Sequence, residues 1–182
     1  MSGNSVAATI SDLFFTLFGG MSAATTVLVS TPLGANRLEE ARSNGYKLVG
    51  YSTMLAFIFG IAMFITSNIV PIIYNHITPE AQHAAMMFIR VQACMFWIYM
   101  LSCEFYFILR AGGDMKNTLV MDSVFMWCVN IPIVGFLTYF TNINFLLLYI
   151  AGQLTDLVKL FLAYSLVAKE RWVVNLTVNN LE

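Results

Sequence analysis

The amino-acid sequence predicts an all-α fold, a polytopic membrane helix bundle with about five transmembrane helices. Of the 182 residues, 59% are hydrophobic and only 10% are charged, whereas soluble domains carry about 25% charged residues. The hydrophobic residues form continuous runs that reach the ~20 residues that a membrane-spanning helix needs. Polar and apolar residues do not alternate along these runs, as they would in the strands of a membrane β-barrel.

The predicted spans follow one another along the whole chain, separated by short connections. They are Val6–Ser30, Leu48–Tyr74, Ala84–Leu109, Thr118–Phe140 and Phe145–Ala168. In the fourth span, Pro132 removes a backbone hydrogen bond in mid-helix, so we expect a kink there.

Two connections carry helix start and stop signals. The stretch "GANRLEEARSNG" predicts a short separate helix, with Asn36 as N-cap, Glu39 completing a capping box and Gly45 ending the helix. The stretch "HITPEAQ" predicts that the third helix begins outside the lipid, with Thr78 as N-cap and Pro79 at its first position. A third connection contains Gly112 and Gly113, which allow the chain to reverse direction.

Lysine and arginine occur in alternate connections only, and this asymmetry predicts the orientation. The connections after the first and third spans and the C-terminal tail contain such residues, and those after the second and fourth spans contain none. The basic residues are Arg37, Arg42, Lys47, Arg110, Lys116, Lys169 and Arg171. Because positive residues favour the cytoplasmic side, we expect an outside N-terminus and a cytoplasmic tail at 169–182. The net charge of −1 argues against a nucleic-acid partner.

Four motifs, in order along the chain, carry a family resemblance. They are "LGANRLEEA" (33–41), "ILRAGGDMKNTLVMDSVFMWCVNIP" (108–132), "QLTDLVK" (153–159) and "RWVVNL" (171–176). The chain thereby resembles the C-terminal half of the multidrug and toxic compound extrusion (MATE) family. The resemblance implies that residues 1–182 form one membrane domain, a six-helix lobe that lacks its first helix. It also implies a missing N-terminal lobe as partner.

The same resemblance implies an activity. Members of the family are plasma-membrane antiporters that export drugs and organic cations, driven by sodium or protons, and they use no cofactor beyond the coupling ion. In the family, acidic residues of the cation site in this lobe come from its first and fourth helices. The most direct alignment places Tyr99 at the acidic position of the fourth helix.

Charged residues inside the apolar runs are the candidate functional residues, because such groups are costly in lipid and mark a pathway or a buried partner. They are Asp12, Arg90, Glu104, Asp122, Asp156 and Lys159. Glu104 has two interpretations. It binds the coupling ion, or it pairs with a basic residue near the cytoplasmic turn, such as Arg110.

The other acids have structural readings beside the functional one. Asp156 and Lys159 are spaced (i, i+3) and can meet on one helix face, next to Tyr149 and Gln153. Asp122 can reach the membrane interface or Lys116.

Asp12 belongs to a stripe of small and polar residues in the first span. The stripe is suited to helix packing, or to lining a cavity where it meets the missing lobe. Its members are Asp12, Thr16, Gly19, Ala23, Thr26 and Ser30.

Two other classes of function compete with transport. One is a non-transporting membrane subunit or assembly partner. The other is an intramembrane enzyme, since "AGGD" (111–114) is close to the Gly-x-Gly-Asp signature of intramembrane aspartyl proteases. That signature fails at Ala111, and the sequence has no Tyr-Asp pair for the second aspartate, so we expect no enzymatic activity.

Overall fold

The computed structural model describes residues 2–69, 72, 78–140 and 145–175 of the chain. Every regular element in this part is helical. Five helices are long and apolar enough to cross a membrane, namely Ala8–Gly34, Leu38–Ser67, Pro79–Ala111, Met115–Phe140 and Leu146–Ala168. The predicted fold class and number of spans are therefore confirmed.

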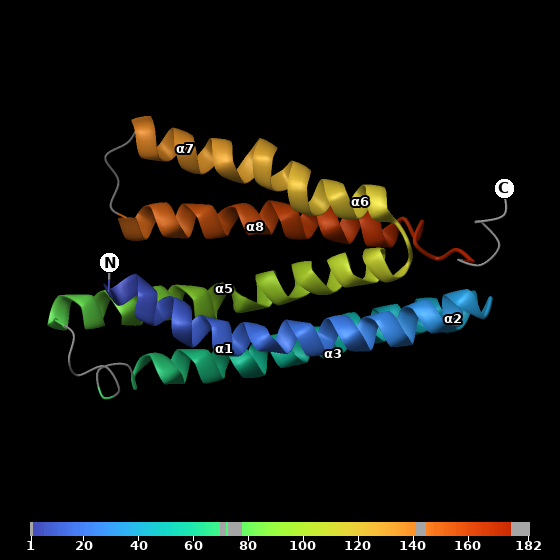
Figure 1. Cartoon of the computed structure of the whole chain (residues 1–182), viewed down its shortest axis with the longest axis horizontal. Coiled ribbons are helices and arrows are strands. Elements are labelled where there is room, and N and C mark those ends of the chain that lie inside the picture. The colour runs from blue at the N-terminus through green and yellow to red at the C-terminus, as the bar shows by residue number, and fades with distance from the viewer. Residues whose placement is uncertain (1, 70–71, 73–77, 141–144, 176–182) are drawn as a thin grey trace.

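The spans are built from the labelled elements of Figure 1. The first span joins α1 (Ser2–Thr25), the π-helical η1 (Thr26–Ser30) and α2 (Thr31–Gly34). The second and third are α3 (Leu38–Ser67) and α5 (Pro79–Ala111). The fourth joins α6 (Met115–Leu119), the π-helical η2 (Val120–Val124) and η3 (Met126–Asn130), and α7 (Ile131–Phe140); the fifth is α8 (Phe145–Ala168).

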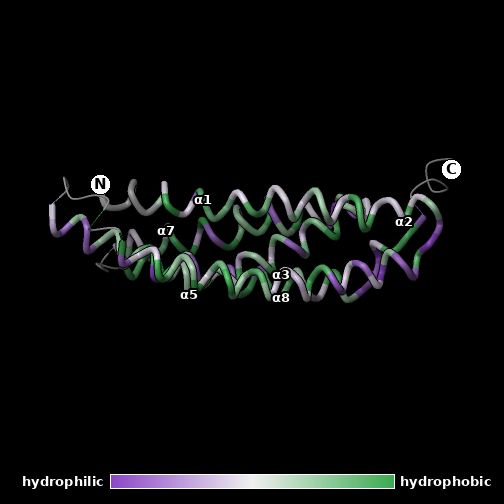
Figure 2. Tube along the Cα trace, turned by 90° about the horizontal axis from the view of Figure 1, so that it is seen from below, coloured by the Kyte–Doolittle hydropathy of each residue, from purple (hydrophilic) through white to green (hydrophobic). Residues whose placement is uncertain are grey.

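The spans lie side by side, with α5 in the middle. It packs against α1 and α3 on one side and against α8 on the other (Figure 1). The N-terminus lies at one end of the bundle. The turns between α2 and α3 and between α5 and α6 lie at the other end, with residues 169–175 (Figure 1). Figure 2 shows hydrophilic residues concentrated towards the two ends and hydrophobic residues along the length between them.

The predicted N-cap and first residue of the third helix are confirmed. Thr78 has an extended backbone, and its Oγ1 accepts a hydrogen bond from the backbone N of Ala81 at 3.4 Å. Pro79 occupies the first helical position, where its missing N–H has no intrahelical partner to lose.

The predicted short helix between Gly34 and Gly45 is wrong. Asn36 has a positive φ of 58° and lies in the turn after α2, so it does not cap a following helix. The helix α3 begins at Leu38 and continues through Gly45 into the membrane. Gly45 is glycine because of close packing: a Cβ there would lie 2.8 Å from Cη2 of Trp172.

Each of two prolines within the spans follows a π-helical stretch. η1 ends two residues before Pro32, and η3 ends two residues before Pro132. A proline ring clashes with the carbonyl one turn earlier and leaves it without a donor, and a wider π turn accommodates this. Before Pro32, that carbonyl belongs to Leu28, and the side-chain Nδ2 of Asn44 donates to it at 3.0 Å. The disturbance predicted at Pro132 thus takes the form of π turns.

Residues 169–175, here called the tail segment, fold back against the bundle. Trp172 is completely buried, and its Nε1 donates to the carbonyl of Val167 at 3.1 Å. Glu170 Oε1 accepts hydrogen bonds from Arg42 Nε (2.8 Å) and Tyr46 Oη (3.0 Å) on α3. The predicted tail is therefore packed structure as far as residue 175, and residues 176–182 lie outside the described residues.

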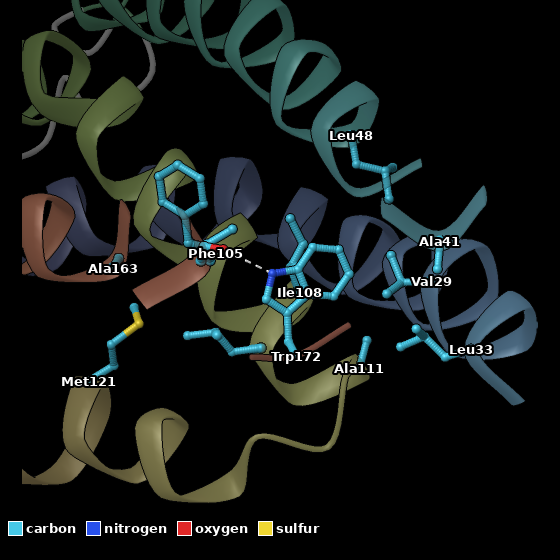
Figure 3. Packing of buried hydrophobic residues seen from close by; sticks show 12 residues of the cluster. Val29, Leu33, Ala41, Leu48, Phe105, Ile108, Ala111, Met121, Ala163 and Trp172 are labelled. Carbon is cyan, nitrogen blue, oxygen red and sulfur yellow. Dashed lines mark hydrogen bonds between the residues drawn. The ribbon is translucent and has the colours of Figure 1, made fainter. Parts of the chain in front are cut away.

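Trp172 completes a hydrophobic cluster that joins every span at this end of the molecule (Figure 3). The cluster consists of Val29, Leu33, Ala41, Leu48, Phe105, Ile108, Leu109, Ala111, Met121, Ala163, Val167 and Trp172. The predicted reversal between α5 and α6 is also present, with Gly113 at a φ of 77°. Gly112 has a different reason to be glycine, because a Cβ there would lie 2.5 Å from the carbonyl oxygen of Trp172.

Candidate functional site

Glu104 lies at the meeting point of three spans and is 1% exposed. It projects from α5 towards two hydroxyl residues that are themselves completely buried, Thr25 at the end of α1 and Ser52 on α3. Thr25 Oγ1 donates to Glu104 Oε1 at 2.7 Å. Ser52 Oγ donates to the carbonyl of Leu48 at 2.8 Å, so Glu104 Oε2 has no hydrogen-bond partner among the described residues.

The predicted pairing of Glu104 with Arg110 is wrong. Glu104 forms no ion pair within the described part of the chain, and Arg110 is exposed at the end of α5. The spacing of the two residues places them roughly a third of a turn apart around the helix axis. Glu104 therefore faces the core of the bundle, and Arg110 faces away from it.

The hydrogens around Glu104 suit a protonated carboxyl. The Thr25 hydroxyl has one hydrogen, yet its oxygen lies 2.7 Å from Glu104 Oε1 and 2.9 Å from the carbonyl oxygen of Met21. With an ionised Glu104 both of these oxygens are acceptors, and one hydrogen cannot serve both fully. A proton on the carboxyl would satisfy both contacts, and it would also remove an unpaired charge from a buried position.

A second arrangement lies on the other side of α5, in a groove of about 360 Å³ between α5, α8 and the fourth span. The lining residues are Tyr99, Asn130, Val134, Leu148, Tyr149, Gly152, Gln153 and Asp156. A smaller hollow of about 210 Å³ shares Tyr99 and Gln153 with it and is also lined by Phe15, Gln92, Met95 and Phe96. These two hollows together are called the polar groove below, after the hydroxyl, amide and carboxyl groups among their lining residues, although most of the lining surface is apolar. The structure brings together Tyr99, Asp156 and the predicted polar face of Tyr149 and Gln153.

The charges beside the polar groove pair differently from the prediction. Lys159 Nζ lies 3.7 Å from Asp122 Oδ1, an ion pair that joins α8 to η2. Asp122 therefore pairs with Lys159 and not with Lys116. The predicted salt bridge between Asp156 and Lys159 is absent from the described ranges, although Lys159 still acts electrostatically on Asp156. Two carboxyl groups thus lie near one ammonium group, which forms an ion pair with Asp122 alone.

Tyr99 and Asp156 are neighbours in the groove although they come from different spans. Tyr99 is 39% exposed and lies on α5, and Asp156 lies on α8. A carboxyl group from α8 therefore lines the same groove as Tyr99 of α5, the position at which the family resemblance implies an acid.

Two uncharged amide side chains that organise the groove are not among the residues predicted from the sequence, because only charged residues were singled out there. Gln92 Oε1 accepts hydrogen bonds from Ser11 Oγ (2.9 Å) on α1 and from Tyr149 Oη (3.1 Å) on α8. Asn130 Nδ2 donates to Thr155 Oγ1 at 2.7 Å and links the fourth and fifth spans. The (i, i+7) spacing of Gln92 and Tyr99 on one helix face could have indicated the first of these.

Asp12 is exposed and lines neither the enclosed Glu104 site nor the polar groove. The neighbouring stripe residues Thr16, Gly19, Ala23 and Thr26 are exposed as well, and a Cβ built on Gly19 meets no atom within 4 Å. In the part of the chain that the structure describes, these residues therefore form an open face, and only the last stripe residue, Ser30, contacts another span, donating to the carbonyl of Ala111 at 2.9 Å.

Comparison with known proteins places the chain in context. The family model described as MatE matches residues 1–136, from α1 into α7. No curated protein and no solved structure matches the chain.

Proposed function

The chain belongs to the MatE family of membrane transporters, and on that premise we propose that it exports organic cations, drugs included, by antiport with protons or sodium. The observation that carries the proposal is Asp156, a carboxylate without an ion-pair partner that faces the polar groove of a membrane bundle. A carboxyl group within a membrane span is costly unless function or a partner compensates it. An organic cation in the groove would compensate it.

The groove has the composition that such a substrate needs. Tyr99 and Tyr149 offer aromatic faces to a cation, and Val134 and Leu148 offer apolar contacts. Its volume of about 360 Å³ falls in the range of small-molecule sites, roughly 300–1,000 Å³. Asn130 and Gln153 add hydrogen-bonding groups that can orient the ligand.

The coupling ion has a separate candidate position at Glu104. Of the two ions used in the family, we favour a proton there, because the contacts of Thr25 leave room for one more hydrogen. Alternating access requires that ion and substrate favour opposite states of the transporter. Two carboxyls on opposite sides of α5 would allow proton binding and substrate binding to act on the same helix.

We further propose that this chain works as the C-terminal lobe, lacking its first helix, with an N-terminal lobe as partner in the plasma membrane. The exposed stripe at Gly19 and Ala23 supports a helical partner. The same stripe also supports the second candidate, a non-transporting assembly subunit. Both candidates predict that the 182-residue chain, reconstituted alone, shows no energy-dependent efflux. Energy-dependent efflux by the chain alone would contradict both.

Asp156→Asn in the assembled transporter tests the substrate role. The amide keeps the size of the side chain and removes its charge, so cation affinity should fall by about 1.5–3 kcal/mol, roughly 10- to 150-fold. Asp12→Asn is the matched control, because Asp12 is exposed outside the groove, and it should leave affinity unchanged. Equal affinity for a fluorescent organic cation in the Asp156 variant and the parent would reject the groove as the substrate site.

The proposed orientation, N-terminus outside and C-terminus cytoplasmic, is tested by labelling single cysteines in a cysteine-free background. Ser43 and Glu80 are exposed at opposite ends of the bundle. An impermeant maleimide added to intact cells should label Glu80→Cys and should not label Ser43→Cys. The reverse pattern would invert the orientation.

A further inference from the structure

A third hollow lies at the end of the bundle, where the turn between α5 and α6 meets the tail segment. Its volume is about 310 Å³, and its lining residues are Gly112, Gly113, Asp114, Lys116, Asn117, Arg171 and Val174. We call it the terminal pocket. It is remote from the polar groove and shares no residue with it.

The two walls of the terminal pocket are held together by Trp172. Its indole is completely buried, and its backbone is so close to Gly112 that a Cβ on Gly112 would lie 2.5 Å from the Trp172 carbonyl oxygen. Arg171 directly precedes this anchor, so the backbone of Arg171 is fixed beside the turn that carries Lys116. The pocket therefore depends on folded structure and is more than a collection of surface charges.

The terminal pocket has more basic than acidic side chains, which favours an anionic ligand. Lys116 and Arg171 have no ion pair in the described part of the chain. The one acid of the pocket, Asp114, already accepts hydrogen bonds from Asn117, from its backbone N at 3.3 Å and its Nδ2 at 2.6 Å. The acid of the tail segment, Glu170, binds Arg42 on α3.

The position of the terminal pocket indicates which kind of anion it binds. The membrane-spanning helices α5 and α8 end at Ala111 and Ala168, and the next one starts at Met115, so the pocket lies at the level where the hydrocarbon of the membrane ends. Phospholipid headgroups occupy this level, and basic pockets between helices there are suited to anionic lipids. Val174 and the two glycines give the pocket an apolar part next to its cations.

We propose that the terminal pocket binds the phosphate headgroup of an anionic phospholipid, with Lys116 and Arg171 as the two cations that contact it. The ligand is a lipid of the surrounding bilayer and not a transported substrate.

The test uses the purified 182-residue chain in nanodiscs and measures the retention of phosphatidylglycerol relative to phosphatidylcholine by native mass spectrometry. We expect selective retention of phosphatidylglycerol by the parent chain. Lys116→Gln with Arg171→Gln should lower it roughly 25-fold, the product of about fivefold for each basic residue at the membrane surface. The control is Arg37→Gln with Lys47→Gln, which removes the same charge from exposed positions outside the pocket and should have less than about a twofold effect.

Trp172→Ala keeps both cations but releases the tail segment from the bundle. It therefore tests whether lipid retention needs the folded pocket or only the positive charge at this end of the protein. We expect the same loss of phosphatidylglycerol as in the double variant. If this variant does not fold, judged by circular dichroism, Gly112→Ala displaces the tail segment through the clash at the Trp172 carbonyl and takes its place.

Three outcomes would overturn the proposal. An equal loss in the control double variant would mean that only net charge matters. Unchanged retention after release of the tail segment would mean that no pocket is required. Displacement of the lipid by inorganic phosphate alone, at concentrations comparable with the lipid, would mean that the pocket is a site for free anions.

Discussion

Glu104 and Asp156 are both carboxyls within membrane-spanning helices, but the two sides of α5 surround them differently. Glu104 is enclosed by α1, α3 and α5, with hydroxyl groups as its neighbours. Asp156 faces a groove with aromatic and amide neighbours, beside an ion pair. The spans differ in the same sense: within an 18-residue apolar stretch of each, 17%, 28% and 39% of the residues are buried in the first, second and third spans, against 11% in the fourth and in the fifth. The enclosed side suits a neutral group and the open side suits a charged partner.

The largest effect should follow from Glu104→Gln. The amide has a size similar to that of the carboxylic acid but cannot release a proton, so proton-driven efflux by the assembled transporter should fall to background. The folded fraction should be close to that of the parent, because the amide has both an oxygen and an N–H group with which to keep the hydrogen bond to Thr25 Oγ1. Efflux is measured under an imposed proton gradient and normalised to folded protein, with thermal stability recorded alongside.

A spectroscopic readout on the 182-residue chain accompanies this experiment. A protonated carboxyl gives an infrared C=O band that the Gln variant should lack, and the same band should persist in Asp156→Asn. Normal efflux together with a lowered melting temperature would contradict the coupling role and leave Glu104 as a structural residue.

The next largest effect concerns the packing on the two sides. Trp172→Ala should lower the free energy of unfolding by about 3–5 kcal/mol, the usual cost of emptying a large buried aromatic site. Trp127 on the fourth span is 72% exposed, so Trp127→Ala should cost less than about 0.5 kcal/mol. Denaturant titration in detergent micelles measures both. Similar losses in the two variants would contradict the packed state of the tail segment.

A smaller effect is expected from adding one methyl group to α3. Gly45→Ala places a Cβ 2.8 Å from Trp172, and such overpacking costs about 1–3 kcal/mol. Gly50 lies on the same helix with nothing within 4 Å of its Cβ position, so Gly50→Ala should be neutral or stabilising by up to about 1 kcal/mol. If the same titration showed that Gly45→Ala stabilises the protein and Gly50→Ala destabilises it, the contact between α3 and the tail segment would be refuted.

The smallest effect should come from Thr25→Val, which removes the hydrogen-bond partner of Glu104 and keeps the shape of the side chain. One such bond contributes about 1 kcal/mol to stability. Thr26 is the neighbouring control, because it is exposed and bonds only to the carbonyl of Ser22; Thr26→Val should change stability by less than about 0.5 kcal/mol. Equal changes would show that the Thr25–Glu104 contact does not stabilise the enclosed side.

The spans could be predicted from the sequence because their length and apolar composition are local properties. The contacts between side chains of different spans could not be predicted, because they depend on which helices lie side by side. Asp156 and Lys159 have the right spacing for a pair, but Asp122 approaches Lys159 from another span. The local pattern at Gly45 predicts a helix end, because Trp172, the neighbour that requires a glycine there, is distant in sequence. The polar neighbours of Glu104, Thr25 and Ser52, come from two other spans, so a local sequence pattern could not predict its enclosure.

The anchored Trp172 has a consequence for how the protein is made. Residues 169–175 leave the ribosome after all five spans, yet they cover the glycine surfaces of α3 and of the turn that follows α5. Until then, a growing chain exposes the Gly45 and Gly112 surfaces, and a product truncated after α8 exposes them permanently. The last folding step at this end of the bundle can thus take place only after synthesis has passed residue 172.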